Sequence, residues 1–129
     1  MRRVIEFGKR VILAECEEKR CDLILGGFLS LLSRFGKEIS HLMDKYEIPD
    51  QILLMFKVGN GDLQGMYRVH SEDISKHLIV IDIYTRHFFV YGSEHELLET
   101  FVHEIIHHKI KSEKKTVAET SRAMRKLTG

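Results

Sequence analysis

Two histidines and a glutamate carry the spacing in this sequence that is best suited to chemistry. His103, Glu104 and His107 form an H-E-x-x-H string inside FVHEIIHH, residues 101–108. On an α-helix, residues four positions apart share a face, so both imidazoles can turn a nitrogen toward one ion. Glu104 lies beside His103 around the helix and can reach a water on that ion without being a ligand. The string therefore predicts a metal site suited to hydrolysis.

The same string could also arise by chance, since the chain has eight histidines. The surrounding residues favour the metal site. Four apolar residues of the segment define one stripe: Leu98, Phe101, Val102 and Ile105. At about 100° per residue, His103 and His107 point nearly opposite to that stripe. They are not needed for a core contact, and this leaves them available to an ion.

A zinc site with only two protein ligands would be weak, so a third ligand is expected. After His108 the sequence has no His, Cys or Asp, which leaves Glu113 and Glu119. Glu113 lies six residues past His107, a position that a related pattern uses for its third ligand after a glycine turn. Here Ile110 replaces that glycine, and the charge run around Glu113 is typical of a solvated loop.

Glu119 is the third ligand that we favour from the sequence. It follows the polar segment 109–115, across which the chain could reverse and return a carboxylate to the histidines. Thr116 and Glu119 also form a T-x-x-E string, so the alternative is that Glu119 caps its own helix. His108 points away from the other two histidines, and we expect it at the surface or in contact with a metal ligand instead of the metal.

Helices and strands must position these residues. The spacing of apolar residues from Cys21 predicts that the first third of the chain is helical, with a second helical segment over 37–47 that ends before Pro49. Ser93 and Glu96 match a capping box, so the helix that carries the histidines should begin near Ser93. A last helix is predicted over 116–127.

Between these helices the sequence changes to short runs rich in β-branched and aromatic residues, at 51–59, 65–70 and 78–85. The GNGD string at 59–62 predicts a hairpin between the first two runs, and 88–92 is a fourth strand or a loop. We therefore predict one α+β domain over residues 1–129, with N-terminal helices, a small and mainly antiparallel sheet of three or four strands, a helix with the histidines and a C-terminal helix with Glu119.

Charge and composition narrow the partners. The chain has 20 basic and 19 acidic residues, so no overall field attracts nucleic acid or an anionic membrane. The longest uncharged early stretch, 23–33, is shorter than the roughly 20 residues of a membrane span. Charges interrupt any secretory signal, and we expect a cytoplasmic protein with Cys16 and Cys21 as reduced thiols.

The strings HEIIHH and AETSRAMRKL, joined by a short polar loop, resemble the gluzincin clan of metallopeptidases, most closely its single-domain minigluzincins. The resemblance covers nearly the whole chain, although only the H-E-x-x-H string is specific. It implies a zinc ion held by His103, His107 and Glu119, with Glu104 as the general base and later proton donor. Arg122 departs from the family, which has a small or acidic residue three positions after its glutamate.

The resemblance also implies a peptide or protein substrate, and an inactive precursor where a terminal segment blocks the cleft. An edge strand, 65–70 or 78–85, would hold the substrate extended. Three side chains between sheet and helix are candidates to stabilise the oxyanion, with ordinary packing as the alternative: Tyr84, His87 and Tyr91.

Two other classes of function remain open. From Lys109 to Lys126 there are seven basic residues against Glu113 and Glu119, so the last helix could bind phosphates, although a solvated face explains such an excess more often. A non-catalytic zinc site, closed by His95 or Glu99, is the other alternative. We expect neither nucleic acid nor membrane as the main partner.

Overall fold

The chain begins with two strands that form a hairpin. In the computed structural model, which describes residues 2–17, 21–57, 65–69, 79–84 and 93–128, β1 (Arg2–Phe7) pairs antiparallel with β2 (Arg10–Cys16). Gly8 lies between them with φ of 60°, as the first central position of a type II′ turn requires. The prediction that this segment is helical is wrong. Every second residue of β2 is buried, and the residues between are partly or fully exposed; the buried ones are Arg10, Ile12, Ala14 and Cys16.

The long helix α1 (Cys21–Lys45) follows. It combines the two predicted helical segments, and the backbone departs from helical angles at Phe35 (φ −117°, ψ 19°). The helix ends before Pro49, as predicted, and Glu47 has a positive φ of 54°. Arg10 joins β2 to this end of α1, because its Nη1 donates to Asp44 at 2.9 Å and its Nε donates to the carbonyl of Ile48 at 3.1 Å.

Within the described residues, five strands form one mixed sheet in the order β1-β2-β3-β5-β4. The three strands predicted after Pro49 are confirmed as β3 (Gln51–Lys57), β4 (Gly65–Val69) and β5 (Ile79–Tyr84). The α+β class is also confirmed. The sheet has more strands than predicted and is not mainly antiparallel, because β3 pairs parallel with both β2 and β5. The chain crosses from β2 to β3 through α1, which is how parallel neighbours are usually joined.

The expected hairpin between β3 and β4 is not formed. β4 pairs antiparallel with β5 instead, and it is an edge strand of the sheet. Of the two strands considered as substrate-binding edges, β5 is interior and β4 lies at the edge of the sheet formed by the described strands. The possible fourth strand at 88–92 and the GNGD string lie outside the described residues.

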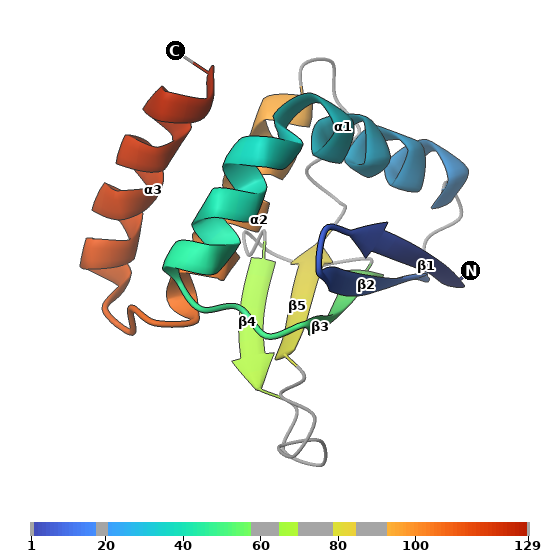
Figure 1. The fold of residues 1–129 in the computed structure, drawn as a ribbon, viewed down its shortest axis with the longest axis horizontal. Helices are drawn as coiled ribbons and strands as arrows, with labels where there is room; N and C mark the ends of the chain where they lie inside the picture. Colours follow the sequence, from blue (N-terminus) through green and yellow to red (C-terminus); the bar gives the residue numbers. More distant parts are fainter. Residues whose placement is uncertain (1, 18–20, 58–64, 70–78, 85–92, 129) are drawn as a thin grey trace.

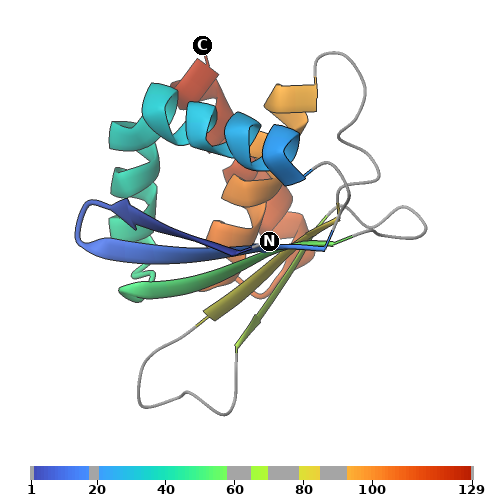
Figure 2. The same ribbon diagram turned by 90° about the vertical axis from the view of Figure 1, so that its right-hand side faces the viewer.

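The helices that the structure describes, α1, α2 (Ser93–His107) and α3 (Glu113–Thr128), all lie on the same side of the sheet (Figures 1 and 2). Phe28 of α1 is the centre of the core: its ring lies 5.7 Å from that of Phe56 on β3 and 5.1 Å from that of Phe101 on α2, both edge to face. These contacts connect sheet and helices in one cluster of buried side chains.

The structure also bears on the expectations for the cysteines and for a membrane span. Cys16, at the end of β2, is disulfide-bonded, so the expectation of a reduced thiol is wrong for this residue. Among the helices that the structure describes, none combines the length and the apolar character needed to cross a membrane.

Candidate metal centre

Helix α2 carries the two histidines through the middle of the domain. It begins at Ser93, as the sequence predicts, and contacts α1, α3 and the strands β4 and β5. Its apolar residues are buried on most sides: Leu97, Leu98, Phe101, Val102, Ile105 and Ile106. A helix held on so many sides fixes the direction in which its remaining side chains point.

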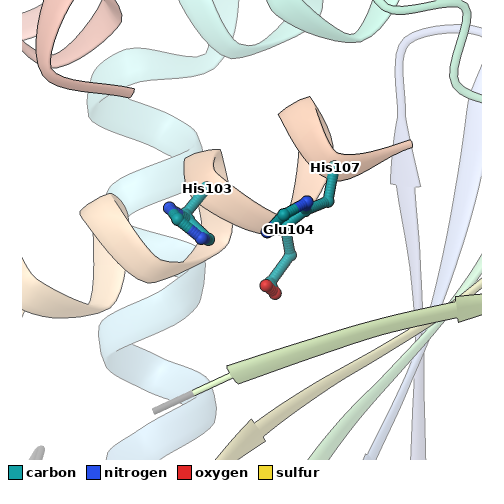
Figure 3. Close-up of side chains that lie close together, drawn as sticks. All are labelled: His103, Glu104 and His107. Carbon is teal, nitrogen blue, oxygen red and sulfur yellow. The ribbon is translucent and has the colours of Figure 1, made fainter. Parts of the chain in front are cut away.

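His103, Glu104 and His107 come together as predicted. One potential ligand atom of each residue lies within 4.8 Å of those of the other two. The imidazole centroids are 4.7 Å apart and their planes meet at 78°. Both rings are partly buried, and Glu104 is only 3% exposed. In Figure 3 the Glu104 carboxylate extends away from the helix, next to the two rings.

The acidic residue that reaches both histidines is Glu113. Its Oε1 lies 3.0 Å from Nε2 of His103, and its Oε2 lies 2.7 Å from Nε2 of His107. Glu113 is not in a solvated loop, since it is the first residue of α3. Ser112 caps this helix, because its Oγ accepts a hydrogen bond from the backbone N–H of Lys115 at 3.3 Å. The carboxylate remains open to solvent on its other side, with the side chain 68% exposed.

Glu119, which we favoured from the sequence, has other partners. Its Oε1 accepts a hydrogen bond from Arg122 at 2.7 Å, and its carboxylate also accepts one from the hydroxyl of Tyr46, the residue that follows α1. The structure does not bring Glu119 into the group formed by His103, Glu104 and His107. Thr116 and Thr120 occupy the face of α3 that meets the histidines. Glu119 lies on another face of α3 and lines a pocket with Leu42 and Lys45 of α1.

The position of the ring hydrogen of His107 follows from a neighbouring carbonyl group. Its Nδ1 lies 3.0 Å from the carbonyl oxygen of Ile110, which can only accept, so Nδ1 carries the hydrogen. In the neutral ring Nε2 then has a lone pair, and this lone pair faces the Glu113 carboxylate, another acceptor. Two acceptors 2.7 Å apart repel each other unless a cation or a proton lies between them.

Burial lowers the pKa of His103 below its ordinary value of 6.5, and the neighbouring carboxylate of Glu113 opposes that shift. Its imidazole is therefore neutral near pH 7, which is the form that binds metals. His108 is absent from the group of His103, Glu104 and His107, as expected. The pKa of His108 is also lowered, again mainly by burial.

The donor set fits zinc. Two imidazole nitrogens and a carboxylate are ordinary zinc ligands. In tetrahedral geometry each ligand atom lies about 2 Å from the ion, so any two ligand atoms are about 3.3 Å apart. The contacts of 3.0 and 2.7 Å between Glu113 and the histidines are a few tenths of an ångström shorter. A small outward movement of the exposed Glu113 side chain would admit an ion.

The other candidates from the sequence have separate outcomes. His87 and Tyr91 lie outside the described residues, and of Tyr84 only the backbone at the end of β5 is described. His95 is paired with Glu99 at 3.7 Å on an exposed part of α2. The basic residues of α3 are exposed, as on a solvated face.

No protein-family model matches the sequence. No curated protein matches it either, and no solved structure matches the fold. The resemblance to minigluzincins rests on the motif residues alone and stays a prediction.

Proposed function

We propose that this chain is a zinc-dependent peptidase in which His103, His107 and Glu113 hold the ion and Glu104 is the general base. The observation that carries the proposal is the contact of one carboxylate with the Nε2 atoms of both histidines, at 3.0 and 2.7 Å. Glu113 takes the role that the sequence assigned to Glu119, because it alone of the two lies at the histidines.

Zinc supplies, when bound, a Lewis acid that polarises a carbonyl and lowers the pKa of water to about 7. The chain has to provide a base next to it. Glu104 lies within 4.8 Å of a ligand atom of each histidine, so a water on an ion held by the histidines would lie within reach of its carboxylate. Because Glu104 is fixed in a buried position on α2, its carboxylate can take a proton from that water and pass it to a leaving amine.

The sheet supports a peptide as the substrate. β4 is an edge strand, and α2 packs next to it. An extended peptide can add to such an edge through main-chain hydrogen bonds, and this would bring its carbonyl groups alongside the histidines. The proposal for the substrate rests on the backbone of β4 and not on its side chains.

The test compares three proteins: wild type, Glu104→Gln, and Glu96→Gln as a matched control with an exposed carboxylate on the same helix. Zinc content and hydrolysis of an unfolded protein such as casein are measured for each. We expect about one zinc per chain in all three. Hydrolysis should fall by about 10²-fold or more in Glu104→Gln only, which is the usual effect of removing a general base.

Two results would count against the proposal. Loss of zinc from Glu104→Gln would mean that Glu104 is a ligand instead of the base. Zinc-loaded wild type that hydrolyses nothing, before and after trimming of its termini by limited proteolysis, would favour the alternative of a non-catalytic zinc site.

A further inference from the structure

Two buried threonines of α3 face the two histidines of α2. The Oγ1 of Thr116 lies 3.3 Å from Nδ1 of His107, and the Oγ1 of Thr120 lies 3.3 Å from Nδ1 of His103. The two threonines are four residues apart on α3, and the two histidines are four residues apart on α2. The contact between the helices therefore repeats after one turn of each. Both threonines are buried, with exposed fractions of 0% and 4%.

The direction of these contacts follows from the single proton of a hydroxyl group. Thr120 donates its proton to the carbonyl of Thr116 at 2.7 Å, and Thr116 donates to the carbonyl of Ser112 at 2.8 Å. With the protons used on the backbone, each Oγ1 can only accept from the histidine. Both rings therefore carry a hydrogen on Nδ1, and a neutral ring then has its lone pair on Nε2.

We propose that Thr116 and Thr120 are positioning residues, which hold both imidazoles in the Nδ1–H tautomer so that the two Nε2 lone pairs meet at one ion. This inference rests on the metal site proposed above. Partners behind a metal-bound histidine commonly fix its tautomer and ring orientation in this way.

The alternative is that the threonines serve only to fill space between α2 and α3. Valine has nearly the same shape and would fill that space without burying a hydroxyl group, whose burial costs free energy unless it is hydrogen-bonded. The two positions also differ in a way that packing does not predict. His107 has the Ile110 carbonyl as a second partner for Nδ1 at 3.0 Å, so Thr120 should matter more to His103 than Thr116 does to His107.

The experiment uses Thr120→Val, Thr120→Ser and Thr116→Val. The control is Thr128→Val, since Thr128 makes the same type of hydrogen bond, to the carbonyl of Met124 at 2.8 Å, on the same helix. Zinc affinity is measured by competition with a chelator, and folding by thermal unfolding. The tautomer of His103 is measured by long-range proton–nitrogen NMR on metal-free protein that also carries Glu113→Ala, because the Glu113 carboxylate would otherwise compete for the same proton.

We expect Thr120→Val to bind zinc about 10- to 100-fold more weakly, and to show a mixture of tautomers at His103. Thr116→Val should show a smaller loss, while Thr120→Ser and Thr128→Val should behave as wild type. If Thr120→Val does not fold, Thr120→Ala removes the same hydroxyl with less volume. A folded variant without this hydroxyl that keeps the Nδ1–H tautomer and the wild-type affinity would overturn the inference.

The two readouts separate this inference from the proposed function. The tautomer is read without metal and without substrate, so a change at His103 supports the role of Thr120 even if no peptide is cleaved. Unchanged tautomers in a protein that binds zinc and cleaves peptides would refute the role of the threonines and leave the peptidase intact.

Discussion

Glu113 and His107 face each other across the turn between α2 and α3, with Oε2 of the carboxylate 2.7 Å from Nε2 of the ring. If this carboxylate is the third ligand, Glu113→Gln should weaken zinc binding by more than about 100-fold. Residues that only hydrogen-bond to a metal ligand change the affinity by at most about that factor. Glu119→Gln, six residues further along the same helix, is the matched control and should keep its zinc. Metal analysis and chelator competition measure both.

The opposite pattern, with zinc retained in Glu113→Gln and lost in Glu119→Gln, would restore the ligand set that the sequence suggested. It would also mean that α3 turns on binding the ion, since Glu119 is held by Arg122 and Tyr46 in this structure.

Zinc should stabilise the folded protein, because an unfolded chain does not hold the ligands together. At a free zinc concentration 100 times the dissociation constant, the gain is about 2.7 kcal/mol. Thermal unfolding with and without a chelator measures it. His103→Ala should unfold at the same temperature in both conditions, and an equal shift in this variant would show that the ion binds elsewhere.

The contact of Phe28 with Phe56 and Phe101 joins sheet and helices. Phe28→Ala should therefore lower the free energy of unfolding by about 3–5 kcal/mol, the usual cost of removing a large buried side chain. Denaturant titration followed by circular dichroism measures this loss. Leu23→Ala on the same helix should change it by less than about 0.5 kcal/mol, since Leu23 is 66% exposed.

Asp44 should make stability depend on pH in the acid range. Hydrogen bonds from Arg10 and Lys9 lower the pKa of its carboxyl below the ordinary value of 3.8. A lowered pKa in the folded state means that the contribution is complete above the unfolded value and is lost as the pH falls through the folded one. Asp44→Asn should be less stable than wild type at pH 7, with a difference that shrinks in acid.

Thermal unfolding between pH 7 and pH 2 checks this expectation. Glu6→Gln, which removes an exposed carboxylate from β1, is the control. A difference between Asp44→Asn and wild type that stays constant over the whole range would show that the pairing with Arg10 does not depend on the charge of Asp44.

Local spacing was enough to predict the first half of the site. His103 and His107 share a face because of the helix repeat, and Ser93 marks where that helix begins. The third acidic residue depends on the path of a turn, which spacing does not determine. The T-x-x-E string at Thr116 and Glu119 has the pattern of a capping box but lies inside α3. The residue that caps this helix is Ser112, which has no glutamate three residues later. The six-residue spacing from His107 was the signal for Glu113.

The N-terminal strands and the order of the sheet were harder to predict for a different reason. In β2 a buried arginine, Arg10, takes a position in the alternation where an apolar residue is expected, so the period of two is hard to recognise. The partners of β3 come from distant parts of the chain, β2 before α1 and β5 after β4. Pairing over such distances is decided by the packing of α1 on the sheet and not by turn residues.

The residues proposed to hold the ion all fall between positions 103 and 113, on two consecutive helices. Gathering them requires the closure of only a short loop, which costs little chain entropy. Zinc binding would therefore stabilise the packing of α3 on α2 and would have little effect on the stability of the β1–β2 hairpin at the other edge of the sheet. Stripping the ion should accelerate amide hydrogen exchange along α3 first, while the N-terminal hairpin keeps its protection.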